Sequence, residues 1–216
     1  MKVKVIGKIN FEDLVERVRK VPLMKSDKEG NPIHVYKKAD ISLRTLHPEE
    51  VNPTTFYLLK KSLDFQRELR KQLMSEYGVD TLNLDCALEL KNEKGEIWTL
   101  TPPIIEVISR KVIYHPSDGE IKHTGAYSIK IPVINDGAHR IYLAREEGIS
   151  FKGLFISNVA ESHPFYAHPN EWNKVKIFDD TPKTKREKKL YSREDNYALY
   201  RNFGILGCGE PRGVSK

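Results

Sequence analysis

The sequence predicts a mixed α/β (α+β) fold, because strand-like and helix-like patterns follow one another along most of its 216 residues. The clearest pattern is an apolar, β-branched run at residues 129–134, which Asn135-Asp136-Gly137 breaks before a helical pattern that stops at Gly148. Strict alternation of apolar residues at positions 82–90 predicts a half-buried strand. Together these patterns indicate a sheet with helices packed against it.

The length allows one sizeable core plus an appendage, or two small domains. We expect an N-terminal extension at residues 1–32, a main domain at residues 33–160, and an aromatic and basic C-terminal segment at residues 161–216 that packs on the core. The hydrophobic fraction of 39% excludes a disordered chain. No apolar run is long enough to cross a bilayer, and the first residues lack a signal-peptide core, so we expect a cytoplasmic protein without membrane contact.

Capping and turn residues mark the elements in the first third of the chain. Asn10 is the expected N-cap of a helix that ends near residue 21. Asn52 followed by Pro53 predicts the start of a long helix that ends near residue 77, at Gly78. A strand is expected at residues 2–6, a loop at residues 22–31 and extended chain at residues 33–43.

The later elements follow from alternation, apolar runs and turn residues in the same way. They are strands at residues 96–100, 104–114, 126–134, 151–156 and 175–178, a turn at residues 116–119, an irregular segment at residues 162–172 and a helix at residues 193–203.

The junction around Gly137 is the strongest candidate for a binding site. A strand that runs through a tight glycine turn into a helix leaves backbone N–H groups unpaired, and the helix dipole adds partial positive charge there. His139 and Arg140 stand in the expected first helical turn, where a guanidinium fork can grip a phosphate at two points. The alternative is purely structural, with Asp136 as a helix cap and Arg140 in solvent.

The string Asp136-Gly137-Ala138-His139-Arg140 resembles the phosphate-binding box of the ParB/sulfiredoxin superfamily, in which a strand ends in a Gly-x-His-Arg turn before a helix. Residues 101–107 (Thr-Pro-Pro-Ile-Ile-Glu-Val) and 46–51 (Leu-His-Pro-Glu-Glu-Val) are similar to two earlier segments of that superfamily. The resemblance covers roughly residues 40–160 and implies a ParB/sulfiredoxin-like domain there. Sulfiredoxins carry a catalytic cysteine where this chain has Ala138, which argues against sulfiredoxin chemistry.

The Asp-Gly-x-His-Arg form is closest to the branch that includes the free serine kinases, which phosphorylate the amino acid with a nucleotide. The resemblance therefore implies that Gly137, Ala138, His139 and Arg140 bind the phosphates of ATP or ADP, with CTP as an alternative. Asp136 is a candidate Mg²⁺ ligand, because carboxylates beside phosphates hold such ions; helix capping is its other role. The implied acceptor is a small hydroxyl compound such as free serine.

Carboxylates elsewhere are candidates for the catalytic group. In the free serine kinases a glutamate of the segment similar to residues 46–51 is catalytic, which implies Glu49 or Glu50 here. The alternative is that both are solvated or interact with a helix N-terminus. Glu106 lies in an otherwise apolar run and needs a partner, for which Arg140 is the candidate.

Two other classes of function stay open. The basic run at residues 183–189 fits a ParB-like DNA-associated protein, either a nucleotide-gated clamp or a nuclease. Glu187 interrupts this run, and no helix-turn-helix pattern follows the ParB-like region, so DNA is not the favoured partner. The remaining class is a non-catalytic nucleotide sensor. A net charge of +6 favours an anionic partner in each case.

Overall fold

The computed structural model describes residues 2–114 and 125–208 and shows a mixed α/β fold, which confirms the predicted fold class. Its central sheet has four strands in the order β2 (Asp40–Leu46), β8 (Phe151–Ser157), β6 (Ile104–Tyr114) and β7 (Gly125–Asp136). The β2–β8 and β6–β7 pairs are antiparallel, and β6 and β8 are parallel. The strand that leads into the candidate site, β7, therefore lies at one edge of this sheet.

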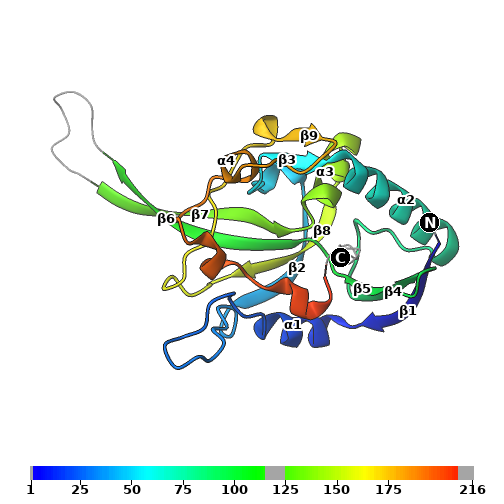
Figure 1. Ribbon diagram of the computed structural model, residues 1–216, viewed down its shortest axis with the longest axis horizontal. Coiled ribbons are helices and arrows are strands. Elements are labelled where there is room, and N and C mark those ends of the chain that lie inside the picture. The colour runs from blue at the N-terminus through cyan, green and yellow to red at the C-terminus, as the bar shows by residue number, and fades with distance from the viewer. Residues whose placement is uncertain (1, 115–124, 209–216) are drawn as a thin grey trace.

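Helices cover both faces of the central sheet (Figure 1). On one face α3 (Ala138–Glu147) shares a core cluster with Ile105 of β6. On the other face α1 (Phe11–Arg19), capped by Asn10 as predicted, shares a second cluster with Ile104 of the same strand. Consecutive strand residues point to opposite faces of a sheet, so the apolar pair at the start of β6 supports both layers.

A smaller antiparallel sheet consists of β1 (Val3–Ile9), β4 (Ala87–Asn92) and β5 (Ile97–Leu100), in that order. The long helix α2 (Lys60–Tyr77) packs Leu69 and Leu73 into a third cluster with this sheet and ends at Gly78, as predicted. Within the described residues, no helix is long and apolar enough to span a membrane.

The C-terminal segment packs back on the body of the protein at several places. Strand β9 (Lys176–Phe178) pairs in parallel with β3 (Tyr57–Leu59), which leads directly into α2. Phe165, Tyr166 and Leu199 form a fourth cluster with Ile108 and Val133 of the central sheet. The remaining short helical turns are η1 (Pro48–Glu50), η2 (Trp172–Lys174), α4 (Lys185–Lys188), η3 (Asn196–Leu199) and η4 (Phe203–Leu206).

The β6–β7 hairpin is the most extended part of the molecule, and its outer half projects beyond the rest of the chain (Figure 1). Its register runs from Ile104 opposite Asp136 to Tyr114 opposite Gly125. The turn predicted at residues 116–119 lies outside the described residues.

The prediction that a helix starts at Asn52 is wrong, because α2 begins only at Lys60. The Asn52 backbone instead extends the edge of β7: its N–H donates to the Pro132 carbonyl and its own carbonyl accepts from Ile134 N–H, both at 2.9 Å. Both backbone groups of Asn52 are used in strand-like pairing, so the local Asn-Pro helix signal is overridden by tertiary contact.

The helix predicted at residues 193–203 is also wrong, since only the short turns η3 and η4 form there. Arg201 gives the physical reason, because its guanidinium donates to the carbonyls of Leu199 at 2.8 Å and Pro164 at 3.1 Å. The predicted strand at residues 82–90 begins only at Ala87, and the extended chain at residues 33–43 becomes a strand at Asp40.

Candidate functional site

The predicted junction forms a tight strand-to-helix turn. Strand β7 ends at Asp136, Gly137 adopts a left-handed conformation (φ 86°) and α3 begins at Ala138. A Cβ atom at Gly137 would lie 2.9 Å from Pro103 Cβ, so a larger residue would meet both strain and a steric clash. The first intrahelical bond runs from Ile141 N–H to the Gly137 carbonyl, which leaves the preceding N–H groups of the first turn without intrahelical partners. The turn therefore offers donors and the positive end of a helix dipole.

Arg140 lies beneath this turn, with 4% of its surface exposed. Its Nη1 donates to the Thr101 carbonyl at 2.5 Å, and its Nη2 lies 3.8 Å from Asp136 Oδ2. Burial lowers the pKa of Arg140, an effect that the charge of Asp136 opposes. The expectation of an outward-facing guanidinium fork is therefore corrected: the guanidinium is buried under the turn, donates to the Thr101 carbonyl and adds positive charge there.

His139 is half-buried and accepts a hydrogen bond through Nε2 from the Leu59 backbone N–H at 3.2 Å. Leu59 is the N-cap residue of α2, so this bond ties the candidate turn to the start of the long helix. Burial lowers the pKa of His139 to about 4, and the positive charge of Arg140 acts in the same direction. The ring is therefore neutral at pH 7 and supplies no positive charge to a phosphate. His139 could contact a phosphate only through its backbone N–H.

The lowered pKa of His139 predicts a loss of stability in mild acid. Its pKa is lower in the folded state than the ordinary value near 6.5, so protonation favours the unfolded chain. The stabilisation is complete above pH 6.5 and is lost as the pH falls toward 4. We expect the free energy of unfolding to drop by about 2 kcal/mol between pH 7 and pH 5 in urea titrations. His139→Gln keeps an acceptor and should lack this part of the dependence; an equal drop in both proteins would contradict the assignment.

Glu106 pairs with Arg201 and not with Arg140, which corrects the predicted partner. Arg201 Nη2 lies 2.7 Å from Glu106 Oε1, and its Nε donates to Oε2 at 3.1 Å. Tyr36 OH donates to the same Oε2 at 2.6 Å, and Asn135 Nδ2 donates to Tyr36 OH at 2.9 Å. Burial together with the Glu106 charge raises the pKa of Tyr36 well above its ordinary value. This buried network holds Asn135, the residue next to Asp136, in place.

Glu49 and Glu50 lie at the other end of α3 from the glycine turn. Glu49 Oε1 pairs with Arg145 Nε at 2.7 Å, and Glu50 Oε2 accepts from the His47 N–H at 2.5 Å as a cap of η1. Arg145 follows Ala138 by seven residues, roughly 10 Å along a helix that rises 1.5 Å per residue. The structure therefore gives both glutamates structural partners and does not bring them to the turn.

The glycine turn opens onto a cleft of about 1010 Å³ between the start of α2, β5 and the C-terminal segment. Asp136 is the only carboxylate that lines it within the described part of the chain. Side chains of aromatic and basic type complete the walls, among them Tyr57, Tyr197, Tyr200 and Lys188. The size and the mixture of aromatic walls with a few polar groups are typical of ligand sites.

Cys208 also lines this cleft, with its Sγ 3.8 Å from Thr101 Oγ1. Burial raises the pKa of the Cys208 thiol to about 12, and the charge of Asp136 adds to the effect. A protonated thiol is a poor nucleophile, so Cys208 does not replace the catalytic cysteine that sulfiredoxins carry at the position of Ala138.

Comparison with protein families shows which domain contains this site. The family model of the ParB CE domain matches residues 13–176, which is more than half of the chain and includes the glycine turn. The chain belongs to the ParB CE domain family. No curated protein and no solved structure matches the chain.

The ParB CE domain match supports the ParB side of the resemblance read from residues 136–140. Several residues of the site carried no such signal in the sequence. Arg201 comes from the segment beyond the matched domain, Tyr36 comes from the stretch that precedes β2, and Lys188 lines the cleft from the basic run. The lone carboxylate Glu106 in an apolar strand predicted a buried partner, but the identity of that partner depends on tertiary packing.

Proposed function

We propose that this ParB CE domain protein binds a nucleotide in the cleft at the N-terminus of α3. ATP or ADP is the expected ligand, with CTP as the alternative. One observation carries the proposal: Gly137 and His139, whose N–H groups lack intrahelical partners, line the same cleft of about 1010 Å³ as the carboxylate of Asp136. Gly137, Ala138 and His139 would contact the phosphates through backbone N–H groups. Arg140 would act as a positioning residue that holds the turn and contributes charge from behind.

Asp136 fits a role as ligand of Mg²⁺ held jointly with the phosphates. Its side chain is 38% exposed at the rim of the turn. Mg²⁺ typically keeps several waters and uses one or two carboxylates together with phosphate oxygens, so one aspartate is sufficient. Among the described residues no group of three or more ligating side chains exists, so the donor set does not suit a metal bound in the absence of nucleotide. When bound, the ion would neutralise charge on the phosphates.

Phosphoryl transfer to a small hydroxyl compound such as free serine is the reaction that the resemblance implies. Such transfer needs a group that orients the attacking hydroxyl. Glu49 and Glu50 are engaged about two helical turns away, so among the described residues Asp136 is the one carboxylate that lines the cleft, and it can serve either Mg²⁺ or the attacking hydroxyl but not both at once. This single carboxylate also favours a second candidate function, a nucleotide sensor that binds without catalysis.

The experiment compares Asp136→Asn with Glu49→Gln and Glu50→Gln by calorimetric nucleotide binding with and without Mg²⁺, together with ³¹P NMR of product formation. We expect Asp136→Asn to weaken Mg²⁺-dependent binding about 10-fold or more, which is the loss of one charged contact of about 1.5–3 kcal/mol. The two glutamate variants should bind as the parent does.

The outcomes of this comparison separate the candidates. Turnover in the parent that falls about 100-fold in Asp136→Asn at saturating nucleotide and Mg²⁺ supports the phosphotransferase with Asp136 as the orienting group. A similar fall in turnover in Glu49→Gln or Glu50→Gln instead would assign the catalytic role to that glutamate of η1. Nucleotide binding without product formation would support the nucleotide sensor. Failure of the parent to bind any of the three nucleotides overturns the proposal.

The DNA-associated alternative receives less support from the basic run. Lys189 Nζ donates to Tyr166 OH at 2.9 Å and lies 4.6 Å from the centre of that ring. The Lys188 carbonyl accepts from Phe56 N–H at 2.9 Å, and Thr184 caps α4. The end of the run is therefore packed on the body of the protein and is unlike a free arm that tracks phosphates.

A further inference from the structure

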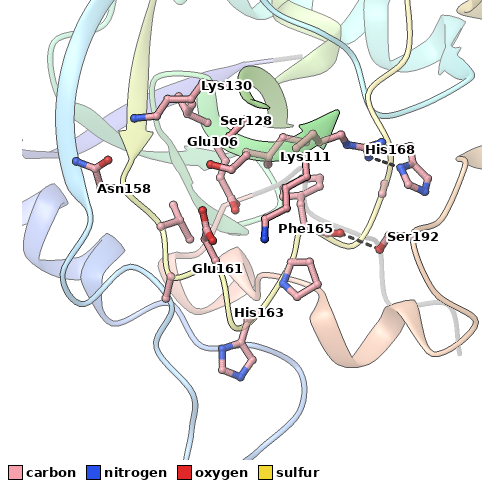
Figure 2. A pocket seen from close by; sticks show the side chains of 18 of the residues that line it. Glu106, Lys111, Ser128, Lys130, Asn158, Glu161, His163, Phe165, His168 and Ser192 are labelled. Atoms are coloured by element: carbon pink, nitrogen blue, oxygen red, sulfur yellow. Dashed lines mark hydrogen bonds between the residues drawn. The ribbon is translucent and has the colours of Figure 1, made fainter. Parts of the chain in front are cut away.

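Strand β6 has a free edge along its outer half. Strand β8 pairs with it only from Ile104 to Glu106. Asn158 then takes a left-handed conformation (φ 56°), and its side chain donates to the carboxylate of Asp40 at the start of β2. The chain after Asn158 no longer pairs with β6, and a cavity of about 590 Å³ lies between the two segments (Figure 2).

The strand register shows which backbone groups of β6 face this cavity. Leu154 N–H of β8 donates to the Pro103 carbonyl at 2.8 Å, so the backbone groups of odd-numbered residues point to this side of the strand. The pairing with β7 agrees with this direction. The Pro132 carbonyl bonds outward to Asn52 N–H, so the residue opposite Pro132, which is Val107, also points away from the β6–β7 ladder.

Beyond Glu106, odd-numbered residues of β6 present unpaired backbone groups to the cavity. The Val107 carbonyl and both backbone groups of Ser109 and Lys111 have no hydrogen-bond partner among the described residues. Residues 107–111 line the cavity over about 13 Å of strand, the length of four or five residues of a second chain. A free edge of this kind is a template for another strand.

The two faces of the hairpin beside this edge differ in character. Lys111 and Lys130 share one face, and both are exposed. Lys130 stands behind the short side chain of Ser109, its opposite residue, and can reach across it to the edge. The other face carries Ile108, which packs in one cluster with Phe165. A strand added beside β6 would therefore have a basic surface next to one face and a largely apolar surface next to the other.

The charges around the edge select the kind of strand that fits. Arg110 lies on the apolar face, where it contacts the His168 ring, while Lys111 and Lys130 lie on the other face. Among the described residues, Glu161 is the one carboxylate that lines the cavity without an ion pair. A second copy of this chain would bring the same three cations against the first set, and like charges on paired strands are destabilising. An acidic strand is therefore favoured.

We infer that an extended acidic peptide segment of a partner protein docks on this edge of β6 by strand addition. The docked strand bonds through its backbone to the free groups of Ser109 and Lys111. Its side chains alternate between the two faces, so acidic residues lie beside Lys111 and Lys130 and apolar residues extend the cluster that contains Ile108. The site is separate from the nucleotide cleft and does not depend on it.

The test is an amide NMR titration of the ¹⁵N-labelled full chain with a capped octapeptide in which glutamate alternates with valine, at pH 7.5. Saturable binding should slow hydrogen exchange about 10-fold or more at the Ser109 and Lys111 amides, which face the cavity. The Ile108 and Arg110 amides point to β7 and should keep their exchange rates. Attraction between charges alone would not produce this alternation along the strand.

A proline variant tests the same edge by mutation. Ser109→Pro removes one cavity-facing N–H and leaves the ladder with β7 intact, so it should weaken peptide binding about 10-fold or more. The matched control is Ser128→Pro, because Ser128 lies opposite Lys111 and directs its N–H to the outer edge of β7. This control should bind the peptide as the parent does.

Several results would overturn the inference. One is the absence of saturable binding, and another is binding that leaves exchange at Ser109 and Lys111 unchanged or slows all four amides equally. A peptide with lysine in place of glutamate should bind at least 10-fold more weakly, and equal binding would contradict an acidic partner. Sedimentation of the parent alone should show no self-association through this edge; a dimer that Ser109→Pro abolishes would assign the edge to a second copy instead. The exchange pattern in the parent decides the question even if a proline variant fails to fold.

Discussion

Replacing Arg201 with methionine is expected to lower the free energy of unfolding by about 3–5 kcal/mol, because it leaves the charge of Glu106 buried without a partner. The same change removes the donors that hold the Leu199, Pro164 and His163 carbonyls. For a protein of this size the midpoint of thermal unfolding should fall by on the order of 10 °C. Urea unfolding of parent and variant measures the difference directly.

The control is the double variant Glu106→Leu/Arg201→Met, which removes both charges together. Replacement of a buried ion pair by apolar residues of similar volume is often nearly neutral, so the double variant should recover most of the lost stability. The carbonyls bound by Arg201 would still lack donors, and recovery should therefore be incomplete. A single variant within about 1 kcal/mol of the parent would show that Glu106 finds water or another partner, and would contradict the account of a closed network.

The local parts of the fold were predictable from the sequence, and the glycine turn is the best example. An apolar β-branched run, a break at Asn135-Asp136-Gly137 and a helical pattern to Gly148 are short-range signals, and the structure has β7, the left-handed glycine and α3 at those positions. The N-cap at Asn10 was readable for the same reason, since its side chain accepts from Asp13 N–H only three residues away.

The parts that failed depend on contacts between distant segments. The start of α2 was misplaced because Asn52 pairs with β7 through residues 80 positions later in the chain. The partner of Glu106 was misassigned because Arg201, 95 residues away, competes with the nearer Arg140. Arg140 itself was expected to face outward, yet its partner Thr101 belongs to the segment that precedes β6. No local pattern encodes these choices.

The second prediction with a large effect concerns Ala138, the first residue of α3. Ala138→Asp would place a carboxylate in the first turn of α3, between Gly137 and His139, which both line the cleft proposed to hold the phosphates. At about 4 Å, repulsion between two unit charges near a protein surface is about 4 kcal/mol, so nucleotide affinity should fall about 100-fold or more. An acidic residue at a helix N-terminus stabilises the helix by about 0.3–1 kcal/mol, but Ala138 also packs against an apolar core cluster, so urea unfolding of each variant checks that the fold is retained. Ala138→Asn has nearly the same size without the charge, and it separates repulsion from steric effects.

The most direct test of the nucleotide site is an amide NMR titration of the ¹⁵N-labelled parent with ATP, ADP or CTP and Mg²⁺, followed at Gly137, Ala138 and His139. We expect saturable shifts at these three amides, which are lost in Ala138→Asp and retained in Ala138→Asn. Amides of the β4–β5 turn, such as Lys94, should not move. Saturable nucleotide binding that leaves residues 137–139 unshifted, or that persists unchanged in Ala138→Asp, would contradict the assignment of the phosphates to the N-terminus of α3.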